Sequence, residues 1–254
     1  MMLPLPWQRG QVCAMEKGPC DTRTWPALPG GFTFNSYLIA DDEPLLFHTG
    51  YRKIFPITLE AIKKVMPVEK LRWIGGSHFE GDEYGALNDL LASAPEATPF
   101  GTEIGVLTSL NDFAARPARG FGDGEEFSIG SRRMKWLYTP HVPHGWDCGI
   151  LFDLSTQTLL CGDLFTQAGA NMPPVTESEI LTASEGMRGM MDYYAHATST
   201  STILERLAGL SPAMLACQHG SAYRGDGAAL LRELATTIES ESAKLSQQPR
   251  AVTA

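Results

Sequence analysis

Residues 77–85 carry a run of side chains that can bind metal ions. In the segment SHFEGDEYG, His78, Glu80 and Asp82 stand at alternate positions. Side chains two residues apart in an extended loop point the same way, so an imidazole and two carboxylates would face one small volume. The two carboxylates would repel each other there unless cations filled the volume. The absence of a thiolate favours iron, manganese or zinc held by nitrogen and oxygen over a structural, sulfur-bound zinc.

Three of the six histidines follow apolar, strand-like runs, namely His78, His144 and His219, and Asp163 closes a fourth run. Loops at the carboxyl ends of strands are where α/β folds place their sites. Any one of these residues, taken alone, is more commonly structural. The order HxExD, TPHVPHGW, LLCGDLF and ACQHG is hard to produce by chance, which favours a shared metal site.

Hydrophobic periodicity predicts the elements that must hold these residues. Two predicted hairpins span residues 36–48 and 148–165. Helical spacing of apolar residues predicts four helical regions, at 56–66, 86–91, 177–210 and 227–245. Short apolar runs predict further strands at 71–79, 103–110, 125–130, 133–139 and 213–220.

The chain has no internal Pro/Gly/Ser linker and no repeat of fixed period, so we expect a single domain over residues 1–254. Residues 1–30 are expected to be an N-terminal extension and 246–254 a frayed tail. Strands and helices alternate in two similar halves, which predicts an α/β layered sandwich.

Composition excludes several classes of partner. A formal charge of −9 without a Lys/Arg cluster argues against nucleic acid, because phosphate binding needs basic residues. The chain lacks a run of about 18 apolar residues, so no membrane span is expected, and the first ten residues do not read as a signal peptide. Five cysteines without a CxxC pair suit a reducing compartment, so a cytoplasmic location is expected. Cys148, Cys161 and Cys217 lie in apolar runs and are expected to be buried and non-catalytic.

These motifs resemble the metallo-β-lactamase superfamily and, within it, the diiron domain of flavodiiron proteins and the oxygen-binding diiron proteins. The superfamily pattern HxHxDH appears as HFEGDE at 78–83, and a glutamate in place of the second histidine is the mark of the diiron branch. The resemblance continues through NSYLI at 35–39, GAL at 85–87, GDLF at 162–165, DYYAH at 192–196 and QHGSAYRG at 218–225. It covers nearly the whole chain. It implies an αββα four-layer sandwich with two mixed β-sheets.

The same resemblance assigns ligands to two irons. The first iron would be held by His78, Glu80 and His144, the second by Asp82 and His219, and Asp163 would bridge them. Glu80 offers oxygen where hydrolases carry imidazole, so its site should be harder and better suited to ferric iron.

Four further residues are candidates with alternatives. TPHVPH offers both His141 and His144, and the separation from Asp163 favours His144, which leaves His141 to orient a ligand by a hydrogen bond. Glu83 stands where the superfamily has a histidine on the second metal, so it either coordinates or leaves that iron an open position. Tyr193 and Tyr194, on a predicted helical run, are candidates to line the site.

Two functions compete. The first is a non-haem diiron protein that binds dioxygen and reduces it with electrons from a separate donor protein. No bound flavin is expected, because the sequence has no phosphate-cradling Gly-rich motif and only 35 residues after His219 (254 − 219). The resembled proteins pair head to tail, which implies a homodimer.

The second function is a hydrolase, with zinc or manganese as alternative metals. Its small-molecule substrate would be an ester, thioester, lactone or phosphodiester, attacked by a metal-bridging hydroxide that Asp82 helps to orient. Glu80 and Glu83, in place of two histidines, tell against this reading.

Overall fold

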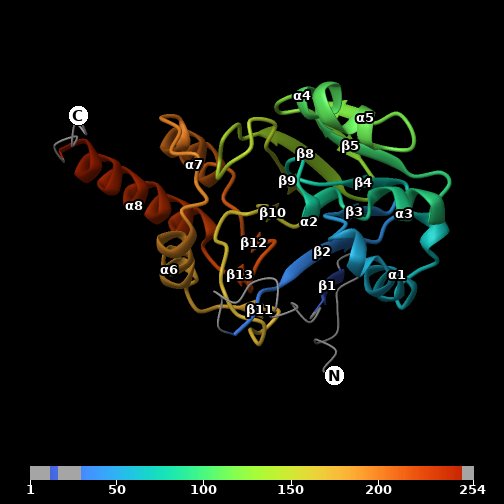
Figure 1. The fold of residues 1–254 in the computed structure, drawn as a ribbon, viewed down its shortest axis with the longest axis horizontal. Helices are drawn as coiled ribbons and strands as arrows, with labels where there is room; N and C mark the ends of the chain where they lie inside the picture. Colours follow the sequence, from blue (N-terminus) through green and yellow to red (C-terminus); the bar gives the residue numbers. More distant parts are fainter. Residues whose placement is uncertain (1–11, 17–29, 248–254) are drawn as a thin grey trace, which may run out of the picture.

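Two mixed β-sheets lie face to face between two sets of helices (Figure 1). The computed structural model describes residues 12–16 and 30–247. The six-stranded sheet has the order β1-β2-β3-β4-β5-β6. Its strands are β1 (Val12–Glu16), β2 (Phe34–Ile39), β3 (Leu45–Phe47), β4 (Trp73–Gly75), β5 (Thr98–Thr102) and β6 (Arg119–Phe121). Strands β1 to β3 pair antiparallel, and β3 to β6 pair parallel.

The seven-stranded sheet has the order β11-β13-β12-β10-β9-β8-β7. Its strands are β7 (Glu126–Ser128), β8 (Arg133–Tyr138), β9 (Gly149–Asp153), β10 (Thr158–Leu160), β11 (Val175–Thr176), β12 (Met214–Ala216) and β13 (Ala222–Arg224). Two of its pairs, β10 with β12 and β11 with β13, are parallel, and the other pairs are antiparallel.

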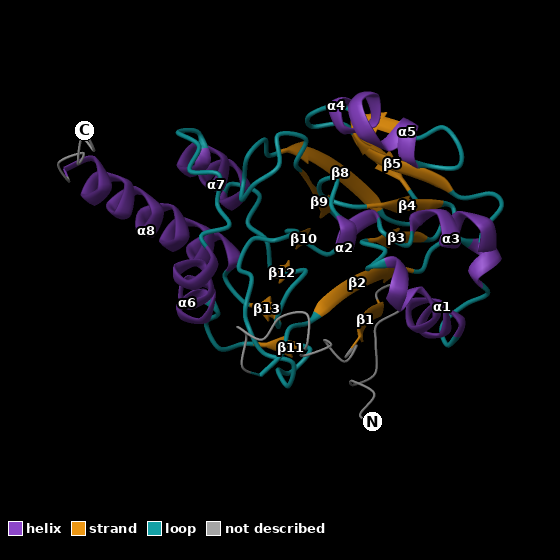
Figure 2. Cartoon of the chain, viewed as in Figure 1, coloured by secondary structure: helices purple, strands orange, loops and turns teal. Residues whose placement is uncertain are grey.

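Helices form the two outer layers (Figure 2). Beside the six-stranded sheet lie α1 (Phe55–Lys63), α2 (Gly81–Tyr84), α3 (Leu87–Ser93), α4 (Glu103–Gly105) and α5 (Asn111–Phe113). Beside the seven-stranded sheet lie α6 (Leu181–Met191), α7 (Thr200–Ala208) and α8 (Gly227–Gln247). None of the helices among the described residues combines the length and the apolar character that a bilayer crossing requires.

The strand sequences explain the layers, because alternate side chains point to opposite faces of a sheet. In β2, Leu38 packs toward α1 and α3, whereas Tyr37 and Ile39 pack between the sheets. In β9, Ile150 packs in the core beneath the other helices, and Leu151 packs between the sheets. Three separate apolar cores result, as a four-layer αββα sandwich requires. The predicted fold is confirmed.

The structure corrects one predicted strand. Residues 103–110 form α4 and a π-helical turn at Val106–Leu110, because Thr102 caps this segment by accepting a hydrogen bond from Gly105 N. Val106 and Leu110, four residues apart, are buried on one face, whereas Leu107 is 77% exposed. The apolar residues of this run follow the spacing of a helix, not the alternation of a strand, so the predicted strand is wrong.

The predicted ends of the chain are described only in part. Within the expected extension at 1–30, residues 12–16 form β1, which pairs with β2. Residues 1–11 and 17–29 lie outside the described residues, as do 248–254 of the expected tail. Residues 246–247 belong to α8.

Candidate metal centre

Four side chains converge on one point between the two sheets. One donor atom from each of His78, Glu80, His144 and Asp163 lies within 4.8 Å of the others. Glu80 Oε2 is 2.8 Å from His78 Nε2 and 3.2 Å from His144 Nε2. Asp163 Oδ2 is 3.2 Å from His144 Nε2 and 3.7 Å from His78 Nε2. These are the four residues that the resemblance implies around a first metal.

Asp163 also faces a second group of donors. Its other oxygen, Oδ1, lies 3.1 Å from His219 Nε2, and His219 Nε2 lies 3.3 Å from Asp82 Oδ2. Each oxygen of Asp163 therefore points to a different set of histidines. This is the geometry that a carboxylate shared by two cations needs.

The ends of four elements bring these residues together. His78 follows β4 of one sheet, and Asp82 lies in the first turn of α2. Asp163 and His219 follow β10 and β12 of the other sheet, which pair parallel with Leu160 opposite Ala216, so each residue lies three positions beyond the same register. His144 lies in the connection from β8 to β9. Parallel strands thus deliver two ligand candidates to one edge.

Ring orientation is fixed from behind for two of the histidines. His219 Nδ1 donates to the backbone oxygen of Thr33 at 2.7 Å, and the ring of Phe32 lies over it at 4.4 Å. His78 Nδ1 lies 3.1 Å from Glu83 Oε1. In both cases Nε2 is the nitrogen that faces the cluster, as in metal-bound histidines whose other nitrogen donates a hydrogen bond.

Glu83 turns away from the shared volume. It is fully buried and accepts hydrogen bonds from the backbone nitrogens of Ser77 and His78 and from the Ser77 hydroxyl. His48 Nε2 lies 3.6 Å from its Oε2, and burial lowers the pKa of His48. This placement favours the alternative in which Glu83 does not coordinate and leaves the second metal an open position, and it sets the carboxylate behind His78.

Close contact shifts the acid–base properties of the cluster. Hydrogen bonds with His144 and His78 lower the pKa of Glu80 to about 2. Burial disfavours a charged ring at His144 and His219, but hydrogen bonds with Asp163 outweigh it, and these pKa values rise to about 9 and about 10. The metal-free cluster thus holds protons where cations would bind, and metal binding must displace them.

Of the remaining candidate residues, one lies at the cluster and two lie away from it. Tyr193 lines the pocket over the cluster, with its ring 6.1 Å from that of His144, and burial raises the pKa of its phenol. Tyr194 instead packs in the core beneath α6, and both tyrosines follow α6 rather than lying in it. His141 is exposed, and among residues 30–247 its ring forms no hydrogen bond or ion pair with the candidate ligands.

Asp147, which the sequence analysis did not name as a candidate, positions the ligand loop. Its Oδ2 accepts a hydrogen bond from Phe79 N at 2.9 Å, between the candidate ligands His78 and Glu80. The Thr102 hydroxyl donates to the backbone oxygen of Asp147 at 2.7 Å. The only sequence signal for this role is that Asp147 follows His144 by three residues.

A small pocket opens onto the cluster, with a volume of about 120 Å³. Apolar and aromatic side chains make up much of its wall, and sequence reasoning named only Tyr193 among them. The others are Phe32, Phe34, Tyr51, Met187 and Met191. The polar atoms at its floor are those of the candidate ligands.

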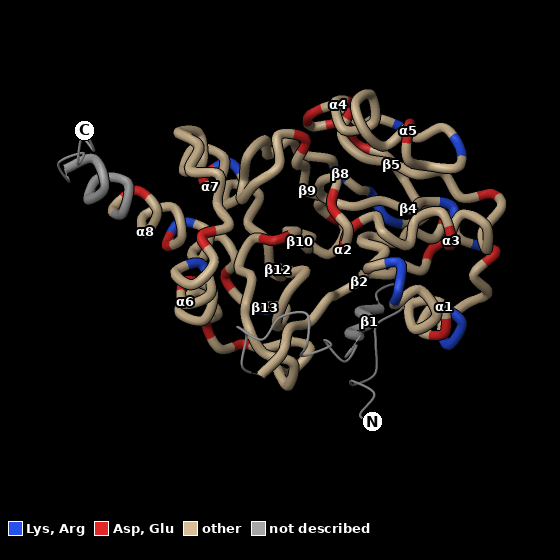
Figure 3. Tube along the Cα trace, viewed as in Figure 1, with Lys and Arg blue, Asp and Glu red and all other residues tan. Residues whose placement is uncertain are grey.

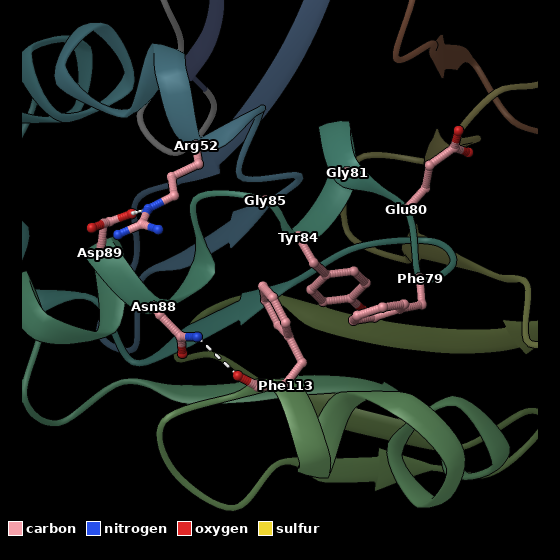
Figure 4. A pocket seen from close by; sticks show the side chains of 9 residues that line it. All are labelled: Arg52, Phe79, Glu80, Gly81, Tyr84, Gly85, Asn88, Asp89 and Phe113. Carbon is pink, nitrogen blue, oxygen red and sulfur yellow. Dashed lines mark hydrogen bonds and ion pairs between the residues drawn. The ribbon is translucent and has the colours of Figure 1, made fainter.

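A larger cavity, of about 440 Å³, adjoins the far side of Glu80. The rings of Phe79, Tyr84 and Phe113 face one another in it, and Arg52 pairs with Asp89 at its other end (Figure 4). The Glu80 carboxylate points away from these rings (Figure 4). Of the candidate ligands, only Glu80 lines this cavity, so the chemistry belongs to the smaller pocket.

Basic and acidic residues are distributed differently over the described part of the chain. Lys and Arg are scattered over separate elements rather than gathered in a stripe (Figure 3). Acidic residues stand at α2, in the middle of the molecule, where the ligand loop lies (Figure 3). Carboxylates are therefore concentrated where the candidate metal ligands meet, as cation binding requires.

Comparison with known families agrees with this geometry. The model of a family described as "ODP family beta lactamase" matches residues 32–220, which include every candidate ligand. The chain belongs to this family. The predicted resemblance is therefore confirmed, and the donors present, all nitrogen and oxygen, fit two hard or borderline cations.

Proteins that are similar in sequence to this chain extend the comparison. This chain is 26% identical to rubredoxin-oxygen oxidoreductase of Megalodesulfovibrio gigas. The match covers 84% of this chain and 55% of that protein. The chain is 26% identical to diflavin flavoprotein A 1 of Synechocystis over 54% of its length and 24% of the relative. The chain therefore spans about half or less of these relatives.

Solved structures share the fold. The crystal structure of rubredoxin oxygen:oxidoreductase from Desulfovibrio gigas superposes with a TM-score of 0.72 at 23% identity, covering 89% of this chain and 59% of that one. A metal-soaked flavodiiron core from Synechocystis superposes with a TM-score of 0.73 at 19% identity, covering 92% and 59%.

Proposed function

We propose that the chain binds dioxygen at a two-iron centre and reduces it with electrons from a separate donor protein. The observation that carries this proposal is the position of Asp163, whose two oxygens face two different sets of donors. His78, Glu80 and His144 would hold the first iron, and Asp82 and His219 the second. When bound as a ferrous pair, the irons would supply electrons to dioxygen.

The donor set supports iron. Three carboxylates, Glu80, Asp82 and Asp163, stand beside three imidazoles, and this mixed oxygen and nitrogen set suits iron. The relative from Megalodesulfovibrio gigas is named as an oxidoreductase of rubredoxin and oxygen. Iron is therefore the metal that we assign.

Pocket size supports a very small substrate. A volume of about 120 Å³ is far below the roughly 300–1,000 Å³ of pockets that enclose drug-sized molecules. It can take a diatomic molecule and a few waters, since one water occupies about 30 Å³. The small volume favours dioxygen over the larger substrates of the hydrolytic alternative.

The pocket walls have two tasks in this proposal. Phe32, Met187 and Met191 exclude water from the face where dioxygen would bind. Tyr193 places a phenol at the same face, and its raised pKa keeps the proton on that oxygen at neutral pH. The wall thus combines an apolar entry with one proton-bearing group.

Metal content and the optical spectrum of protein purified without oxygen test the proposal. We expect about two irons per chain and a new visible band on exposure to air. Steady oxygen consumption on addition of a reduced donor protein would extend binding to reduction. Zinc in the protein as isolated, with no spectral response to air, would overturn the proposal and favour a hydrolase.

A further inference from the structure

Glu83 is the most enclosed carboxylate near the cluster, and each of its oxygens has several partners. Oε2 accepts from the backbone nitrogens of Ser77 and His78, the latter at 3.0 Å. Oε1 accepts from the Ser77 hydroxyl and lies 3.1 Å from His78 Nδ1. A buried carboxylate with this many donors can keep its charge.

The backbone makes room for Glu83 at Gly76. A Cβ atom there would stand 2.7 Å from Glu83 Oε2. A Cβ at Gly162, which precedes Asp163 and has a positive φ of 53°, would collide with the Ser77 side chain that donates to Glu83. The glycines on both sides leave space for the carboxylate and its partner, so Glu83 occupies a built socket rather than a chance position.

The hydrogen bonds around Ser77 place a proton on Nδ1 of His78, and a metal ion would replace any proton on Nε2. The Ser77 hydroxyl has one proton and donates it to Glu83 Oε1. Ser77 Oγ is also 3.2 Å from His78 Nδ1, so towards this nitrogen it can only accept. His78 Nδ1 therefore faces two acceptors, Ser77 Oγ and Glu83 Oε1, and must be the donor. Nε2 is left facing Glu80 and Asp163.

We propose that Glu83 is a positioning residue, which holds the Nδ1 proton of His78 and thereby directs the Nε2 lone pair to the first metal ion. The inference rests on the proposed metal centre, but not on iron or on oxygen chemistry. An anionic acceptor behind an imidazole orients the ring and strengthens it as a donor. The site thus takes a carboxylate where the superfamily pattern has a histidine, and uses it for the first metal rather than the second.

The substitution that tests this role is Glu83→Gln, which keeps the size of the side chain and removes the charge. We expect the affinity of the first metal position to fall about 10–100-fold, the range for partners behind metal-bound histidines. Glu83→Asp withdraws the carboxylate by one methylene, so a smaller loss in the same direction is expected. This second variant serves if Glu83→Gln does not fold.

The experiment loads metal-free protein with Co²⁺ alone, without oxygen or a donor. It measures two properties: stepwise affinity by optical titration, and the proton NMR signals of ring N–H groups shifted by the paramagnetic ion. His78 and His219 should each give one such signal. In Glu83→Gln the His78 signal should move or vanish, whereas the His219 signal, whose N–H donates to Thr33, should stay.

His48→Asn is the matched control, because it removes a different side chain that lies near Glu83 and leaves the His78 side chain unchanged. Asparagine also tolerates the positive φ of 66° at this position. We expect its His78 signal to persist and its affinities to change by less than about threefold.

Two results with Glu83→Gln would overturn this inference alone. Unchanged affinity and an unchanged His78 signal in Glu83→Gln would make Glu83 a filler of space. Loss confined to the second Co²⁺, with the His78 signal intact, would make it a ligand of that ion. Failure of the unaltered protein to bind Co²⁺ would overturn the metal centre itself, and both proposals with it.

Discussion

The two sides of the cluster hold a histidine in different ways. On the first side, the charged carboxylate of Glu83 lies behind His78, deep in the protein. On the second side, the neutral backbone oxygen of Thr33 receives the proton of His219. The first side also gathers four candidate ligands, including Asp163, and the second three. We infer that the first position binds its metal more firmly, while the second is left more open to substrate.

The strongest test of this contrast removes the residue that both sides share. Asp163→Asn should deplete both metal positions, with a loss of affinity above about 100-fold, because it removes charge from each half at once. Metal content after dialysis measures this. The control is Asp192→Asn, because Asp192 is an exposed carboxylate that directly precedes the pocket residue Tyr193. This variant should keep both metals. Loss of one metal only would mean that Asp163 does not bridge.

Removing one unshared carboxylate should separate the two sides. Glu80→Ala is expected to deplete the first metal by at least about tenfold more than the second, and Asp82→Ala should do the reverse. Two-step titration of each metal-free variant gives both affinities. Equal loss of both metals in the two variants would show that the halves assemble as one unit, and the contrast would then be false.

Acidity offers a third test, with an effect of up to about tenfold per pH unit for each displaced proton. His144 and His219 have raised pKa values of about 9 and about 10, so their rings are protonated at neutral pH without metal. Metal affinity should rise with pH up to these values. Calorimetry in buffers of different ionisation enthalpy counts the protons released. An affinity independent of pH between 6 and 9 would contradict this.

The same shifts act on the metal-free fold with the opposite sign. Both histidines have pKa values above the ordinary 6.5, so their contribution to stability is complete below pH 6.5 and is lost as pH rises through 9 to 10. Urea unfolding of metal-free protein should therefore weaken over this window. Metal-loaded protein should not show this loss.

The smallest effect concerns the loop that carries the first side. Asp147→Ala leaves the Phe79 nitrogen without its acceptor and should lower the free energy of unfolding by about 1–3 kcal/mol. Asp147→Asn keeps an acceptor oxygen and should cost less. Urea unfolding measures both. Equal losses would mean that the charge of Asp147, rather than the hydrogen bond, holds the loop.

The elements that position the site were predictable where one period dominated the sequence. The alternation through Leu38 and Ile39 identified a strand with two buried faces, and the run at 227–245 identified the last helix. At 103–110 the hydroxyl of Thr102 caps a helix. A pattern of apolar residues does not reveal such a capping hydrogen bond. The resemblance, in turn, supplied the four-layer arrangement with two mixed sheets.

The site was predictable in its members but not in its supports. His78, Glu80 and Asp163 are metal-binding types at telling positions, and the fold brings them together. The directions of Glu83 and His141 depend on which way a loop turns, and spacing does not encode that. Asp147 acts on a backbone nitrogen, which every residue but proline offers, so its partner leaves no trace in the sequence.

The centre also ties together parts of the chain that are remote in sequence. His78 and His219 stand 141 positions apart (219 − 78) and belong to loops of different sheets, which meet here through backbone hydrogen bonds from Gly149 to Ser77 and from Asn35 to Gln218. Metal ions bound there would act as cross-links between sheets and would close very long loops. Only the folded chain assembles such a site, so metal retention also reports on whether the chain is folded. A substitution in either sheet that unfolds the protein would release the metal, even far from the pocket.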